Sequence, residues 1–321
     1  LSDANKRRLS LVFGDIYMDV YRKYASLLPD SQFDKEKTRR LYIMDSTTIS
    51  LFKEILKGAG RKPLNGKKKG GIKAHTLINS SENVPCLIRY SAAARHDHQF
   101  LKEIKLPKGS YITFDKAYVD YAQYEEFTRT GVFYVTRLKS NAKYSLTVRY
   151  EVHPEETVTI IEDADIEFEF TDKQGNRRIH KSRRILYKDP ATDRIFEFLT
   201  NNFDLDATSI AQIYQKRWQI ETLFRQLKQN FPLKYFLGDN VNAIEIQIWV
   251  AMLANLLVSL VRSKVKKNWA FSNMVSVIRQ QLMNYINIFR FLEDPEGAWI
   301  AVNKGSENNN KWTLFPEIRG A

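Results

Sequence analysis

The chain has 321 residues, 43% of them hydrophobic and 27% charged, so it can form one large domain or two smaller ones and is not a disordered polypeptide. Lys and Arg outnumber Asp and Glu by 50 to 37, and the net charge of +13 favours nucleic acid or another anionic surface as the partner, although it could serve solubility alone. A single cysteine, Cys86, excludes a disulfide framework and a cysteine-rich zinc module, which fits a reducing cytosol.

The first 40 residues are expected to form an N-terminal helical segment. Apolar side chains recur at steps of three and four between residues 3 and 28, which predicts a helix. The chain opens on Leu1 rather than Met, so we expect this segment to be the remnant of a longer N-terminal region.

Residues 41–140 alternate between short apolar runs and helical patterns, as the first part of an α/β core would. The sequence predicts a buried strand at 41–44 that ends at Asp45, and a glycine-rich basic loop at 57–70. The further strands are expected at 71–79, 84–91, 110–114 and 132–138, and the helices at 98–105 and 119–129.

Residues 141–205 differ in character, because runs rich in Val, Ile, Phe and Tyr are separated by turn signals. This pattern predicts an all-β insertion. Charge is segregated within it: residues 155–169 are strongly acidic and residues 177–184 strongly basic. An exposed polar sheet face and a DNA-contacting surface are equally consistent with that segregation.

The remaining chain is expected to be helical. One helix begins near residues 206–209, with Asp206 as a candidate N-cap, and ends near Asn230; two more are expected at 242–267 and 271–291, completing the core over 206–295. The apolar run from Ile246 to Val261 contains Gln247 and Asn255 and is too short to cross a bilayer, so it predicts a buried helix and no membrane partner. Residues 296–321 are expected to be a loosely ordered tail.

Three carboxylates stand out by their context. Asp45 and Asp115 each follow an apolar strand, and Glu221 lies in the middle of a predicted helix. Carboxylates brought together in this way would hold Mg²⁺ or Mn²⁺, and two such ions promote phosphodiester displacement. Each residue also has an ordinary interpretation, since an Asp after a strand is often a turn residue and Glu221 could simply pair with an Arg one helical turn away.

The predicted helix places four reactive side chains on one stripe. Tyr214, Arg217, Glu221 and Lys228 fall within about 60° of one another at about 100° per residue. Arg217 and Lys228 suit phosphate binding, and Tyr214 could stack or donate a hydrogen bond, although these three could also be solvated or packed. Trp218 could stack on a base, but a tryptophan is more often part of the core.

Two other motifs give weaker indications. His96-Asp97-His98 suggests a metal site, but two histidines without further partners are poor evidence for one. The run Lys67–Lys69 is consistent with a solvated loop that meets phosphates without specificity.

These motifs resemble bacterial insertion-sequence transposases of the insertion-sequence-4 family over about residues 40–260. Tyr214, Arg217, Glu221 and Lys228 match that family's YREK signature, while Met44-Asp45-Ser46-Thr47 and Phe114-Asp115-Lys116-Ala117-Tyr118 look like its two catalytic Asp segments. The resemblance implies an α/β fold with a ribonuclease-H-like mixed sheet flanked by helices and an all-β insertion before the helix that carries the catalytic Glu.

The resemblance also implies a chemistry. Asp45, Asp115 and Glu221 would be catalytic and would bind two Mg²⁺ or Mn²⁺ ions, while Tyr214, Arg217 and Lys228 would contact DNA near the scissile end. Water would cleave one strand at a transposon end, the freed 3′-hydroxyl would attack the other strand to form a hairpin, and joining to target DNA would follow. The implied partners are double-stranded DNA and a second copy of the chain on paired ends, in the bacterial cytoplasm with the nucleoid.

Two rival functions remain open at this point. One is a structure-specific DNA nuclease on the same fold, and the other is a transposase-derived DNA-binding protein that has lost catalysis. The presence of all three carboxylates argues against the second, and a glycoside hydrolase fits poorly with a basic chain. Only about 40 residues precede Asp45, which puts sequence-specific recognition of transposon ends by this chain in doubt.

Overall fold

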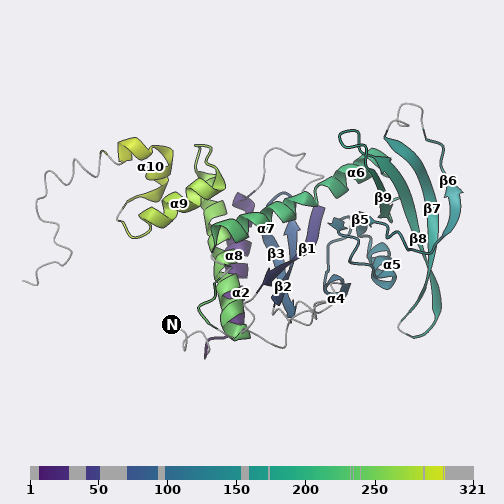
Figure 1. Cartoon of the computed structure of the whole chain (residues 1–321), viewed down its shortest axis with the longest axis horizontal. Helices are drawn as coiled ribbons and strands as arrows, with labels where there is room; N and C mark the ends of the chain where they lie inside the picture. The colour runs from purple at the N-terminus through teal and green to yellow at the C-terminus, as the bar shows by residue number, and fades with distance from the viewer. Residues whose placement is uncertain are drawn as a thin grey trace, which may run out of the picture.

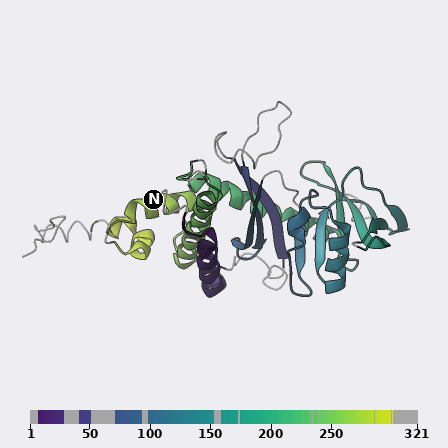
Figure 2. The same cartoon turned by 90° about the horizontal axis from the view of Figure 1, so that it is seen from below.

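A computed structural model describes residues 7–28, 41–50, 71–92, 98–152, 159–172 and 174–300, the last range without 232, 234, 239, 285 and 299. In this part of the chain one continuous sheet of nine strands runs in the order β3-β2-β1-β4-β5-β9-β8-β7-β6. Helices cover it, and the C-terminal helices and the strands of residues 145–200 lie at opposite ends of the molecule (Figures 1 and 2).

The first half of the sheet has a mixed topology. Three strands form an antiparallel meander, and two further strands lie parallel to its first member. The meander comprises β1 (Leu41–Ser50), β2 (Gly71–Asn79) and β3 (Pro85–Ala92), and the parallel strands are β4 (Tyr111–Phe114) and β5 (Phe133–Arg137). This order, 3-2-1-4-5, confirms the predicted ribonuclease-H-like fold.

The parallel pair β4 and β5 needs a crossover, and helix α5 (Tyr121–Thr130) provides it. Asp120 caps the start of α5 by accepting a hydrogen bond from the N–H of Gln123. Gly131 ends the helix with φ of +70°, a left-handed conformation that glycine adopts without strain.

The predicted all-β stretch extends the same sheet. Its strands are β6 (Ser145–Arg149), β7 (Ile160–Thr171), β8 (Arg177–Lys188) and β9 (Ile195–Thr200), and β9 pairs with the core strand β5. The segregated charges of this region meet across the β7–β8 pair, where Asp163 binds Arg183 and Glu167 binds Lys181. The basic stretch of β8 is therefore largely neutralised by its neighbour, which favours the polar-sheet interpretation over a DNA-binding surface.

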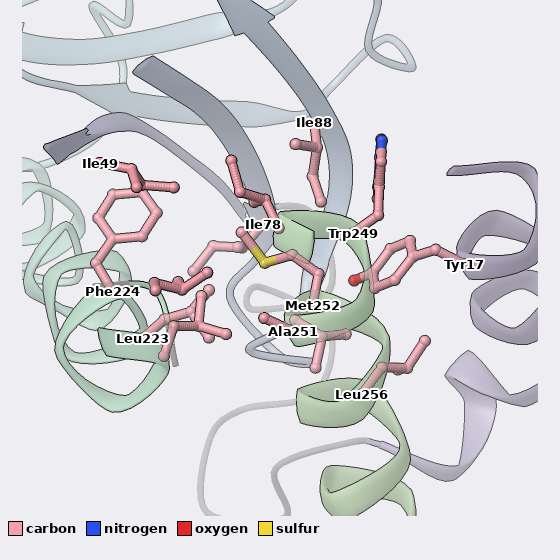
Figure 3. Close-up of a cluster of buried hydrophobic side chains, with 14 of the residues drawn as sticks. Tyr17, Ile49, Ile78, Ile88, Leu223, Phe224, Trp249, Ala251, Met252 and Leu256 are labelled. Atoms are coloured by element: carbon pink, nitrogen blue, oxygen red, sulfur yellow. The ribbon is translucent and has the colours of Figure 1, made fainter. Parts of the chain in front are cut away.

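Helices pack on both faces of the sheet. Short α4 (His98–Leu101) and α5 bury their apolar side chains on one face, and the other face carries helices from both ends of the chain. These are α2 (Ser10–Tyr24), followed by a 3₁₀ turn at Ala25–Leu27, together with α7 (Trp218–Asn230) and α8 (Val241–Lys264). Figure 3 shows their shared core, to which α7 contributes Leu223 and Phe224 and α8 contributes Met252 and Leu256.

Helix α8 is long and apolar enough to cross a membrane by length and composition alone, yet half of its apolar window is buried within the protein. Asn255, which interrupts the apolar run, is fully buried and accepts a hydrogen bond from Gln226 of α7 at 2.8 Å. Gly14 of α2 lets the ring of Trp249 approach, because a β-carbon there would lie 3.0 Å from that ring. These contacts identify α8 as a core helix, as predicted.

Several expectations differ from the structure. The helix predicted at 98–105 ends at Leu101, and the helical residues 295–298 reach into the tail predicted at 296–321. The strand predicted at 41–44 continues to Ser50, so Asp45 lies within β1 and not at its end. The helix predicted at 271–291 is two helices, α9 (Phe271–Gln281) and α10 (Ile288–Glu293). The helix predicted from 206–209 to Asn230 is interrupted at Lys216 and Arg217, which separate α6 (Ala207–Gln215) from α7.

The interruption between α6 and α7 has a packing cause. Helix α6 buries Ile210 and Tyr214 against β5 and β9, whereas α7 buries Ile220 and Leu223 against β1 and α8. The two halves thus serve different parts of the core. Hydrogen bonds to the third preceding residue, such as that from Arg217 N–H to the Tyr214 carbonyl, tighten the backbone between them.

Candidate active site

The strand register brings Asp45 and Asp115 together. The parallel β1–β4 pairing runs to Met44 opposite Phe114, so the two aspartates follow side by side. Met44 and Phe114 point into the core on the α5 face. Because side chains alternate along a strand, Asp45 and Asp115 face the opposite side, which α7 covers. The sequence predicted both aspartates at the ends of strands, but only Asp115 follows one, because Asp45 lies within β1.

Each aspartate is oriented by a backbone N–H and contacts an arginine. Asp45 Oδ1 accepts from the N–H of Ser46 at 2.7 Å, and Asp115 Oδ1 accepts from the N–H of Ala117 at 3.0 Å. Arg137 Nη2 of β5 lies 3.6 Å from Asp115 Oδ2. Sequence reasoning missed Arg137; the available signal was its place at the end of the strand predicted next to the one preceding Asp115.

Burial dominates the electrostatics of Asp45. It raises the pKa of this carboxyl from 3.8 to about 6, although the Ser46 N–H and the Arg217 guanidinium act in the opposite direction. The negative charges of Asp115 and Glu221 raise the pKa further. Asp45 is therefore a carboxylate with too little positive charge around it.

Glu221 reaches the aspartates through Arg217. Arg217 Nη2 lies 2.7 Å from Glu221 Oε1, and Nη1 lies 3.2 Å from Asp45 Oδ2, so one guanidinium bridges two carboxylates. Burial opposes the charge of Arg217, but Tyr214 and these carboxylates outweigh it and raise the pKa of the guanidinium. The predicted i to i+4 pair between Arg217 and Glu221 exists, but it belongs to a three-residue cluster.

An open groove of about 760 Å³ runs along α7 beside these residues. Asp45 and Glu221 line it, and exposed Arg225 and Lys228 lie on the same helix one and two turns further on. Partial burial lowers the pKa of Lys228. The groove therefore presents carboxylates at one end and cations along its wall, as a site for a phosphate chain would.

Tyr214 and Trp218 lie on a second cavity. Tyr214 is buried on α6 with its ring 5.1 Å from that of Phe198, and Trp218 is 58% exposed. Both line a cavity of about 230 Å³ between α6 and strands β8 and β9. The break at residues 216–217 thus separates Tyr214 from Glu221 and Lys228, so the four signature residues do not share one helical stripe. Arg217 still contacts Tyr214 and Glu221, since its guanidinium lies 5.7 Å from the Tyr214 ring and 2.7 Å from Glu221 Oε1.

The residues fit a divalent cation in their chemistry. Carboxylate oxygens are the ligands that Mg²⁺ and Mn²⁺ prefer, and buried Asp45 lacks compensating charge. As they stand, however, no three Asp, Glu, His or Cys side chains in the described ranges lie close enough to hold a metal ion. The guanidinium of Arg217 stands between Asp45 and Glu221 instead.

The weaker motifs cannot be placed. His96, Asp97 and the side chain of His98 lie outside the described residues, as do Lys67–Lys69 and the tail beyond residue 300.

Comparisons with known proteins identify the family of the chain. A transposase DDE domain model matches residues 36–257. The putative transposase y4zB of Sinorhizobium fredii is 33% identical over 259 residues, which cover 80% of this chain and 69% of that protein. The probable transposase of insertion sequence element IS5377 from Geobacillus stearothermophilus is 25% identical and covers 75% of this chain and 62% of its own length.

Two matches are weaker. The putative transposase of insertion sequence element IS4SA from Synechocystis is 23% identical, covering 81% of this chain and 70% of that protein. A piggyBac transposase synaptic complex with hairpin DNA aligns with 88% of this chain and 59% of its own at a TM-score of 0.43 and 10% identity, too weakly to bear on the chemistry. The domain match and the first relative decide the assignment: the chain belongs to the transposase DDE domain family.

Proposed function

We propose that the chain is a DNA transposase that cleaves strands at the ends of its element and joins them to target DNA by a cut-and-paste route with a hairpin intermediate. The observation that carries the proposal is the side-by-side register of Asp45 and Asp115, with Glu221 linked to Asp45 through the shared guanidinium of Arg217, next to a groove with basic residues along it. Membership of the transposase DDE domain family and the net charge of +13 also support it.

The residues take distinct roles in this proposal. Asp45, Asp115 and Glu221 would hold two Mg²⁺ or Mn²⁺ ions, which when bound supply an activated water or 3′-hydroxyl and stabilise the leaving oxygen. Lys228 binds a phosphate of the strand being cut, with Arg225 beside it. Arg217, which lies between the groove residues Asp45 and Glu221, would contact phosphate, and Tyr214 supports the guanidinium of Arg217. Exposed Trp218 offers a face on which a base stacks.

The proposal also covers how copies of the chain assemble on DNA and where in the cell they act. The chain spans 62% to 70% of the length of the three curated relatives. A dimer formed on paired element ends would place two such grooves on one synapse. DNA as the substrate places the protein with the bacterial nucleoid.

A cleavage assay tests the proposal. Purified protein is incubated with Mg²⁺ or Mn²⁺ and duplex DNA that carries the element's own ends. We expect nicks at the end, hairpin products and strand transfer into a second duplex. Nicking without transfer would indicate a structure-specific nuclease, and binding without cleavage would indicate a DNA-binding protein; either result contradicts the proposal.

A matched pair of variants tests the site. Glu221→Gln removes one carboxylate charge, so we expect cleavage to fall by about a hundredfold or more, because bound metal contributes several kcal/mol to the transition state. Glu126→Gln is the control, since Glu126 also pairs with an arginine on a helix, Arg129, but on α5 at the opposite face of the sheet. Full metal-dependent cleavage by Glu221→Gln would show that the site is assigned to the wrong residue.

A further inference from the structure

We propose that Arg217 is a removable clamp: in the free protein it bridges Asp45 and Glu221 in place of metal, and a DNA phosphate draws it away so that metal binds only when DNA does. This inference rests on the proposed function, since it concerns how the same carboxylates are controlled. It adds an order of events, in which the ions enter after the substrate.

The bridge uses both terminal nitrogens of the guanidinium. Nη1 contacts Asp45 Oδ2 at 3.2 Å, and Nη2 contacts Glu221 Oε1 at 2.7 Å. An ion that shares two carboxylates needs their oxygens about 2.0–2.1 Å away for Mg²⁺ and within about 3 Å of each other. The guanidinium occupies that space, so the ion and the bridge exclude one another.

Release of Arg217 requires another anion. Its side chain is only 9% exposed, and a buried charge that loses its partners is costly. Metal alone would have to separate the carboxylates from Arg217 and leave the guanidinium without a counter-charge. A phosphate from DNA lying in the groove supplies that counter-charge, because arginine binds phosphate through two parallel N–H donors.

The position of Arg217 suits such a transfer. Its Nε is buried and has no hydrogen-bond partner among the residues described, so one donor remains for a phosphate oxygen. The rings of Tyr214 and Trp218 lie 5.7 and 5.9 Å from the guanidinium carbon and stay in contact range of a cation that moves only a short way. The residue also lies in the break between α6 and α7, where the regular helical hydrogen bonds are interrupted.

Asp115 is not part of the clamp. It contacts Arg137, a residue of β5, at 3.6 Å. This pair leaves Asp115 positioned while Asp45 and Glu221 are released, so two of the three carboxylates respond to DNA and the third does not.

Thermodynamic linkage makes the clamp measurable without catalysis. If phosphate removes Arg217 from the carboxylates, DNA must raise the affinity for metal, and metal must raise the affinity for DNA by the same factor. Couplings between sites commonly amount to about 5- to 150-fold. A residue that only stabilises the helix N-terminus through its pair with Glu221 would produce no such coupling.

The test measures Mn²⁺ binding by the loss of the free-ion electron paramagnetic resonance signal, with and without a short duplex that lacks a cleavable end. The Asp45→Asn/Glu221→Gln double variant, measured in the same way, corrects for ions bound by the DNA itself. For the unaltered protein we expect DNA to tighten Mn²⁺ binding by about fivefold or more. For Arg217→Gln we expect tight binding without DNA and little further effect of the duplex.

Arg225→Gln controls for general electrostatics. It removes one positive charge from the same groove, and Arg225 has no carboxylate partner among the described residues. We expect it to change Mn²⁺ affinity less than Arg217→Gln and to keep the response to DNA. Arg217→Lys provides a second variant should the first not fold, because an ammonium keeps the charge but loses the two-nitrogen bridge and the paired donors that bind phosphate, so the response to DNA should weaken.

Two outcomes separate the clamp from the proposed function. Equal Mn²⁺ affinity of Arg217→Gln and the unaltered protein without DNA, or a response to DNA that survives in Arg217→Gln, overturns the clamp. The double variant tests the proposed function instead. If it binds Mn²⁺ as tightly as the unaltered protein, both with and without DNA, then the carboxylates are not the metal site and the proposed function is overturned.

Discussion

At the scale of single residues, the site is acidic at one point and basic around it. Asp45 has two carboxylate neighbours and one arginine, and burial leaves its charge poorly compensated. Such a residue destabilises the folded protein when it is ionised, and a bound cation would compensate its charge. This imbalance predicts how stability should depend on pH.

Asp45→Asn should change the pH dependence of stability measured with EDTA present. The pKa of Asp45 is raised to about 6 in the folded protein, above its unfolded value, so the folded state keeps a proton that the unfolded state has lost between about pH 4 and 6. The free energy of unfolding should therefore fall as pH rises through that window. The free energy of unfolding of Asp45→Asn should not fall in this way. The variant should therefore be more stable than the unaltered protein above pH 6, by at most about 3 kcal/mol. The difference should vanish near pH 4.

Asp172→Asn provides a control of opposite sign. Hydrogen bonds, first that from the Asn176 N–H, lower the pKa of Asp172 to about 2, so this carboxylate stabilises the fold at neutral pH. Its removal should cost stability at pH 7, and the cost should disappear as pH falls towards 2. Chemical denaturation across pH measures both variants, and an Asp45→Asn difference that does not vary with pH would contradict the assigned environment.

Lys228→Gln should weaken DNA binding in a way that salt reveals. Each phosphate contact adds about 0.9 to the slope of log affinity against log salt concentration. Loss of the Lys228 contact should reduce that slope by about one and weaken binding similarly for all sequences. Exposed Lys105 follows α4, on the other face of the sheet, and its change to Gln should leave the slope unaltered. Equal slopes for both variants would remove Lys228 from the interface.

At the scale of elements, the β7–β8 pair depends on one buried ion pair. Asp163 binds Arg183 through both oxygens, at 2.8 and 2.5 Å, and Arg183 also donates to the carbonyl of Leu205 just before α6. The arginine therefore ties two strands of the β-rich stretch to the segment that leads into α6 and α7.

Asp163→Ala should destabilise the protein by about 3–5 kcal/mol, because it leaves the buried charge of Arg183 without a partner. Thermal unfolding measures the effect, with Glu126→Ala as the control, since its pair with Arg129 is exposed and should matter little. Combined replacement by Asp163→Leu and Arg183→Met should recover much of the loss. A small effect of Asp163→Ala alone would show that Arg183 finds other partners.

The element scale also shows what the sequence could predict. The strands at 71–79 and 110–114 were predicted within a residue at each end, because turn residues such as Gly70, Gly109 and Asn79–Asn83 mark their ends. The break at Lys216–Arg217 was not predicted, because the sequence there contains neither Gly nor Pro and the cause is tertiary: α6 and α7 pack on different clusters. The bridge formed by Arg217 was missed for the same reason, since its contact with Asp45 spans 172 residues.

At the scale of the whole molecule, a single sheet connects the parts that the sequence suggested were distinct. Strand β9 pairs with both β5 and β8, so the β-rich stretch continues the core sheet that carries Asp45 and Asp115 (Figure 1). Helices α6 and α7 then cross from the insertion to the core and carry Tyr214 and Glu221 with them. The order of elements along the chain thus accounts for the position of α7, whereas the roles of its side chains stay predictions.

Locating Mn²⁺ by anomalous X-ray scattering, in crystals of the protein bound to a DNA end, tests the central claim most directly. We predict anomalous peaks within about 2.0–2.6 Å of carboxylate oxygens of Asp45, Asp115 and Glu221, with Arg217 turned from Asp45 to a phosphate. Peaks at other residues, with none in reach of Asp45 and Asp115, would contradict the account.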